Sequence, residues 1–181
     1  MQNVSKLALV MALCSPLAAF AVDGTITVDG LVTAQSCTIN GVAPSGANNV
    51  AVKLPAVSIS ALKTVGATAG LTPLRIKVGG AGEAGCADGK VASIAFEHGP
   101  NVTADGYLEN KALTGPAENV VVQLFNHDGT GIKIGEAATN NTKATISDHT
   151  ATLEHSVGYR ATGTVSAGAV STSVMYSLSY N

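Results

Sequence analysis

Hydrophobic and polar residues alternate strictly along the last twelve positions of the chain. Successive side chains of a β-strand point to opposite faces, so this pattern predicts a strand with one buried and one solvent-facing side. The face predicted to be buried consists of Val170, Thr172, Val174, Tyr176, Leu178 and Tyr180. The opposite face consists of Ser171, Ser173, Met175, Ser177, Ser179 and Asn181.

Shorter strand-sized runs fill most of the remaining chain and are separated by turn signals. We predict strands over residues 25–39, 50–56, 71–78, 91–97, 120–126, 132–134, 150–165 and 170–180. Asp-Gly pairs at 88–89, 105–106 and 128–129 predict turns between them. Only residues 57–65, with apolar side chains three positions apart, indicate a helical turn. Many short strands at this spacing predict an all-β sandwich.

The first 21 residues have the pattern of a secretory signal peptide. Lys6 supplies a basic start, residues 7–13 are apolar, and residues 19–21 read Ala-Phe-Ala, a small-x-small cleavage site. A bilayer-spanning helix needs about 20 apolar residues, and no run in this chain approaches that length. We therefore expect an exported, soluble protein that begins at Val22 and does not insert into a membrane.

A second alternating run follows the cleavage site directly. One of its faces consists of Val22, Gly24, Ile26, Val28, Gly30 and Val32, and the other is mostly Thr and Asp. The alternation alone fits an ordinary first strand of a closed sandwich equally well.

Two cysteines remain after removal of the signal peptide, because Cys14 lies within it. In an oxidising compartment, Cys37 and Cys86 are most simply explained as one disulfide. Two buried free thiols are the alternative.

Composition agrees with one β domain of modest size. The 160 residues after the signal peptide suit a single domain with a two-sheet core. Lys6 is the one charged residue of the signal, so 9 basic and 12 acidic residues remain, a net charge of −3. A nucleic-acid-binding protein would show a clustered basic face instead. We expect no nucleic acid among the partners.

Three patterns that could carry chemistry lack the context they need. Residues 80–85 read GxGxxG, but a β-branched run rather than a helix follows, so we expect a loop and no cofactor. The sequence has no Gly-x-Ser-x-Gly elbow, so we expect no enzyme. The histidines show no metal-ligand spacing and are expected at the solvated surface, with no metal bound; they are His98, His127, His149 and His155.

Both ends of the mature chain resemble a known family. Gly168 lies fourteenth from the C-terminus and Tyr180 is penultimate, as in the C-terminal motif of chaperone-usher pilins, the subunits of type 1 and P pili. Residues 22–32, Val-Asp-Gly-Thr-Ile-Thr-Val-Asp-Gly-Leu-Val, are similar to the N-terminal extension of type 1 pilus adaptor subunits, with a matching distance to Cys37. Residues 159–163 and 120–129 also look like pilin segments, so the resemblance covers nearly the whole mature chain.

This resemblance implies an incomplete immunoglobulin-like β-sandwich that lacks its final strand and is completed by donor-strand exchange. In that family the extension of the next subunit fills a groove beside the C-terminal strand, a form of strand addition. It also implies a donor-strand extension at 22–35, a pilin domain at 36–181, and a Cys37–Cys86 bridge between the first strand and the end of the third. The implied donor residues are Val22, Gly24, Ile26, Val28, Gly30 and Val32, and the implied groove residues are Gly168, Val170, Val174, Tyr176, Leu178 and Tyr180.

The function implied is that of a structural subunit of a bacterial cell-surface fimbria that supports adhesion. The partners implied are a periplasmic pilus chaperone, an outer-membrane usher and neighbouring pilin subunits. A fimbrial tip adhesin or a carbohydrate-binding β-sandwich module is the alternative. The sequence leaves open whether the subunit belongs to the shaft or is a minor adaptor. It also leaves open the receptor and the identity of the chaperone and usher.

Overall fold

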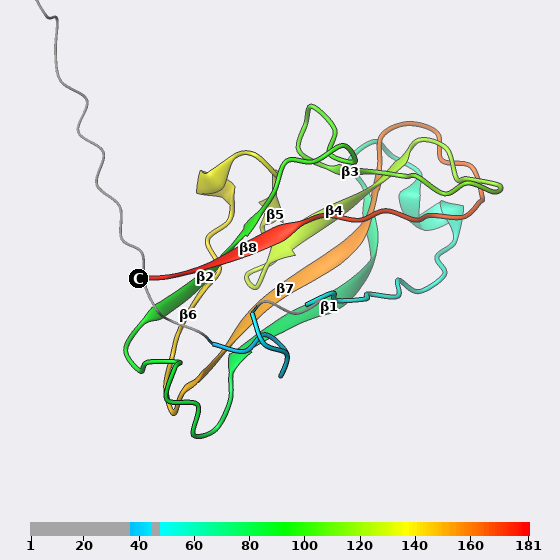
Figure 1. Cartoon of the computed structure of the whole chain (residues 1–181). Helices are drawn as coiled ribbons and strands as arrows, with labels where there is room; N and C mark the ends of the chain where they lie inside the picture. Colours follow the sequence, from blue (N-terminus) through cyan, green and yellow to red (C-terminus); the bar gives the residue numbers. More distant parts are fainter. Residues whose placement is uncertain (1–36, 45–47) are drawn as a thin grey trace, which may run out of the picture. The chain divides into compact units, whose positions relative to one another are not determined.

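A computed structural model describes residues 37–44 and 48–181 (Figure 1). The expected signal peptide and the expected donor-strand extension lie outside the described residues. So does most of the strand predicted over 25–39. Within the described part, no helix is long and apolar enough to cross a membrane.

Two antiparallel sheets make up the domain. The first has the order β1-β7-β4-β3, and β5 also pairs with β4; its strands are β1 (Thr68–Gly79), β3 (Leu108–Glu109), β4 (Val120–Asn126), β5 (Gly131–Ile132) and β7 (Thr150–Ala161). The second has the order β6-β2-β8, with β2 (Val91–Phe96), β6 (Lys143–Thr145) and β8 (Tyr176–Tyr180). The only regular helices among the described residues are short 3-10 turns, η1 (Ile59–Leu62) and η2 (Ala137–Thr139). The predicted all-β architecture is confirmed.

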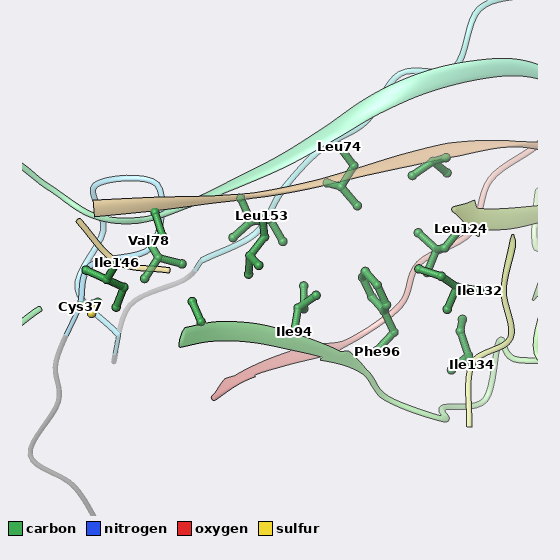
Figure 2. Close-up of a cluster of buried hydrophobic side chains, with 14 of the residues drawn as sticks. Cys37, Leu74, Val78, Ile94, Phe96, Leu124, Ile132, Ile134, Ile146 and Leu153 are labelled. Carbon is green, nitrogen blue, oxygen red and sulfur yellow. The ribbon is translucent and has the colours of Figure 1, made fainter. Parts of the chain in front are cut away.

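The core lies between the two sheets, where their inward-facing side chains meet (Figure 2). Leu153 on β7 and Val78 on β1 are fully buried, at 0% exposure; Leu153 faces Ile94 on β2, and Val78 lies beside Ile146. Removing apolar surface from water is the main favourable term in folding. Both sheets therefore depend on this shared layer for their stability.

The predicted disulfide between Cys37 and Cys86 is present and joins the start of the described domain to the loop after β1. The chain beside Cys37 is tied to β1 as well, because the Gly79 amide donates to the Thr38 carbonyl at 2.7 Å. Glu83 accepts hydrogen bonds from the Thr38 amide at 2.5 Å and from the Thr38 hydroxyl at 2.8 Å. The point where residues 22–35 join the domain is therefore firmly held.

Several strand predictions differ from the structure at their boundaries. The strand over 120–126 is confirmed, whereas β7 ends at Ala161, before the predicted residue 165. β3 and β6 were not predicted, because two or three residues are too few to show an alternation. The strand predicted over 50–56 is wrong for this structure, since these residues join no ladder with other described residues. The predicted helical turn within 57–65 is confirmed by η1.

Replacing Cys86 with Ser should destabilise the domain by about 4 kcal/mol, because a disulfide of this span restricts the unfolded chain. The bridge has a sequence separation of 49 residues. The measurement is urea unfolding of wild-type and variant subunits, together with their periplasmic yield. An unchanged unfolding midpoint, or two alkylatable thiols in native wild-type protein, would contradict this assignment.

Candidate functional site: a groove beside the C-terminal strand

β8 is an edge strand of its sheet within the described part of the chain. It pairs antiparallel with β2 on one side, from Ala92 opposite Tyr180 to Phe96 opposite Tyr176. On its other side it has no strand neighbour among the described residues. The N–H and C=O groups along such an edge can pair with a further strand.

A groove with a volume of about 1310 Å³ runs along this open edge. One wall is the C-terminal segment 170–180, and the facing wall is the segment 48–54. The floor is apolar and belongs to the core between the sheets; it includes Leu74, Ile76, Val122, Leu124 and Val157. The opening therefore leads directly to the main hydrophobic cluster.

The C-terminal wall shows the alternation that the sequence predicts. Every even-numbered residue from 170 to 180 is half-buried, and every odd-numbered residue from 171 to 181 is exposed. Five of the half-buried side chains pack against the core cluster: Val170, Val174, Tyr176, Leu178 and Tyr180. Desolvation raises the pKa of Tyr176 and that of Tyr180 above the ordinary value of a tyrosine hydroxyl. Both hydroxyls are therefore protonated at neutral pH.

Gly168 does not line the groove. Its neighbour Ala169 donates to the Gly115 carbonyl at 2.7 Å and accepts from the Ala117 amide at 2.9 Å. A Cβ on Gly168 would lie 2.7 Å from the Gly115 oxygen and closer still to the main chain of Ala117. Glycine is needed here because two backbone segments approach closely at the beginning of the C-terminal segment.

The facing wall, residues 48–54, is a functional feature that the sequence analysis assigned only as an ordinary strand. Val50, Val52 and Leu54 are half-buried and pack on the core, while Ala51 and Lys53 are exposed. This alternation is that of a strand, but residues 49–56 make no main-chain hydrogen bond to another described residue. The strand prediction fails because the wall borders the open groove.

The six residues expected to form the donor face, from Val22 to Val32, all lie outside the described residues. Their contacts are therefore a matter of proposal.

His155 lies in the core, so the prediction that it is at the solvated surface is wrong. Only 2% of the residue is exposed, and its ring meets Phe96 edge-on with 5.3 Å between centroids. It shares one face of β7 with Leu153 and Val157, a signal that the alternation already contained. Desolvation by burial lowers the pKa of His155 to about 4. In the described part of the chain, no three His, Cys, Asp or Glu side chains are arranged to hold a metal ion.

Comparison with known proteins identifies the family. The family model of type-1 fimbrial protein A (FimA) matches residues 54–181. The chain belongs to this family. Membership places the protein in a cell-surface fimbria.

Relatives of the fimbrial family match the chain over almost its full length. The F17 fimbrial protein of Escherichia coli is 36% identical over 186 aligned positions, covering 99% of this chain and 99% of the relative. The major fimbrial subunit SMF-1 of Stenotrophomonas maltophilia (strain K279a) is 39% identical over 178 positions, covering 94% of this chain and 100% of the relative. The chain is therefore a structural subunit of a fimbria.

Solved pilin structures share the fold. The P pilus rod subunit PapA aligns with a TM-score of 0.54 at 20% identity, covering 80% of this chain and 99% of PapA. A chaperone-usher pilus structure aligns with a TM-score of 0.56 at 18% identity, covering 88% and 96% of the two chains. The immunoglobulin-like sandwich of chaperone-usher pilins is thereby confirmed for this subunit.

The stability of the domain should fall between about pH 6.5 and pH 4, because folding lowers the pKa of His155 to about 4. The unfolded chain binds this proton first as pH falls, so the stabilisation is complete above pH 6.5 and is lost as the pH approaches the folded pKa. We expect a loss on the order of 2 kcal/mol. Urea unfolding at a series of pH values measures it.

His155→Gln should flatten this pH dependence, whereas His127→Gln should retain it, because the His127 side chain is 73% exposed. Equal slopes of stability against pH in wild-type and His155→Gln protein would show that His155 is not the responsible group.

Proposed function

We propose that the groove receives an extended strand from the next subunit, and that residues 22–35 of this chain are donated in turn to the groove of the preceding subunit. The observation that carries this proposal is the open edge of β8 above an apolar groove floor. Strand addition to such an edge uses main-chain hydrogen bonds for affinity and side-chain pockets for register. The result is a polymer held together by donor-strand exchange.

The length and direction of the two walls suit an inserted strand. Residues 170–180 span about 36 Å at about 3.3 Å per residue, and the 14 residues of 22–35 are long enough to follow them. Tyr176 reaches Asn48, while Tyr159, in the cluster that also contains Val170, reaches Pro55. The walls therefore run in opposite directions, and an inserted strand is antiparallel to one and parallel to the other.

Alternation along 22–32 supplies side chains for the groove. Ile26, Val28 and Val32 would each contribute about 1.5 to 3 kcal/mol on burial. Each main-chain hydrogen bond of the ladder would add about 1 kcal/mol. Gly24 and Gly30 fall on the same face, where we propose that a side chain does not fit. Together these terms favour a complex that dissociates very slowly.

Under this proposal the open edge of β8 has to be covered before assembly. An unpaired strand edge beside exposed apolar surface is a template for aggregation. We propose that residues 1–21 direct export, that a periplasmic chaperone covers the groove after removal of this signal, and that an outer-membrane usher exchanges the chaperone for the next subunit. In this scheme residues 36–181 are the accepting domain, and the protein has a structural role without catalysis.

Leu178→Asp should abolish recovery of the subunit with its chaperone, because it places a carboxylate where an apolar strand must dock, at a cost of several kcal/mol. Ser179→Asp is the matched control, since its side chain is on the exposed face of the same strand, where it contacts the Ser93 hydroxyl at 2.8 Å. Ser177 is less suitable because a carboxylate there would lie beside Glu97, to which the Ser177 hydroxyl donates at 2.6 Å. Co-purification with the chaperone is the measurement, and equal recovery of both variants would argue for a closed domain.

Ile26→Asp and Gly24→Leu should prevent residues 22–35 from inserting into the groove of another subunit. The groove of the variant itself should still receive a strand. Chaperone-bound mutant and wild-type subunits are mixed, and oligomer ladders are followed on unheated gels. We expect the mutant to occur only at the end of an oligomer where no donation is required. Normal ladders from Ile26→Asp and from a deletion of residues 22–28 would eliminate the donor role.

A further inference from the structure

The facing wall of the groove is held without a strand ladder. Residues 49–56 have no ladder partner in the described part of the chain, although Val50, Val52 and Leu54 pack on the core. The Asn48 side chain donates to the carbonyls of residues 43 and 44 at 3.1 and 3.4 Å. A segment without a ladder is free to move unless other contacts fix its main chain, and two tyrosine hydroxyls bind its main chain here.

The two hydroxyls lie at opposite ends of the wall and come from different sheets. Tyr176 on β8 donates to the Asn48 carbonyl at 2.6 Å, and Tyr159 on β7 donates to the Pro55 carbonyl at 3.2 Å. Desolvation raises the pKa of both tyrosines, so both hydroxyls remain donors at neutral pH. The wall is thus fixed to the floor sheet at one end and to the accepting strand at the other.

We propose that Tyr159 and Tyr176 are positioning residues for strand uptake, holding the facing wall where the incoming strand will meet it. This inference rests on the proposed donor-strand function. A wall already in place requires less loss of conformational entropy when a strand binds. Once the strand is inserted, the wall gains packing and hydrogen-bonding partners of its own. The hydroxyls therefore affect the rate of association and have little effect on dissociation.

Tyr107 offers a control outside the groove. It is half-buried, its ring lies beneath the Arg160 guanidinium at 5.0 Å, and it does not line the groove. Tyr107→Phe therefore removes a tyrosine hydroxyl without changing either wall of the groove.

The test uses the full chain carrying Ile26→Asp, which under the proposed function cannot give its own strand. Tyr159→Phe, Tyr176→Phe and Tyr107→Phe are each added to this background. A fluorescent synthetic peptide with the wild-type sequence of residues 22–35 is mixed with each protein, and association and dissociation rates are followed by anisotropy. NMR order parameters of the backbone amides from 49 to 54 are measured on the same proteins without peptide.

We expect Tyr159→Phe and Tyr176→Phe each to slow association about fivefold, the equivalent of one hydrogen bond of about 1 kcal/mol, with unchanged dissociation. Order parameters from 49 to 54 should be lower in these two variants, and Tyr107→Phe should match the parent in both measurements. Equal or faster association in both variants, or a change in dissociation alone, would overturn the anchoring role.

Failure of the peptide to bind any protein, the parent included, would instead count against strand uptake itself. The order parameters are measured without peptide and therefore still test the anchors in that case. Order parameters from 49 to 54 that are the same in all the proteins would overturn the anchoring role independently.

Discussion

The need of backbone N–H and C=O groups for hydrogen-bond partners is the constraint on which this structure depends. Nearly all such groups are paired in folded proteins when they are shielded from water. β8 meets that need on one side through β2, and its other edge faces a groove whose floor is the hydrophobic core. A strand that enters the groove would satisfy the edge and cover the core in one step. Under the proposed function, this coupling of polar and apolar requirements is the physical basis of the fimbrial polymer.

The disulfide lies at the end of the domain that residues 22–35 join. Cys37 and Thr38 are tied to the region around Cys86 and Glu83. Under the proposed function, the segment to be donated therefore leaves the domain from a point held by a disulfide and by hydrogen bonds.

Much of this arrangement could be predicted from local patterns. Side-chain alternation from 170 to 180 and the pairing of Cys37 with Cys86 need only short-range regularity and a count of cysteines. The facing wall at 48–54 could not be assigned correctly, because alternation reports burial and not the presence of a ladder partner. Gly168 is determined by the close approach of residues 115–117, a contact between distant parts of the chain that a local pattern does not contain. The burial of His155 was not predicted, because histidine was assigned to the surface by residue type although its position falls on the buried face of β7.

The central claim is that a strand from another subunit fits between β8 and the extended segment 48–54. It is tested most directly by determining the structure of the subunit bound to a peptide of residues 22–35. The account predicts that the peptide lies in the groove, forms a main-chain ladder with β8, and directs Ile26 and Val28 toward the core. A peptide bound elsewhere on the domain, or a groove closed without it by direct pairing of 48–54 with β8, would contradict the account.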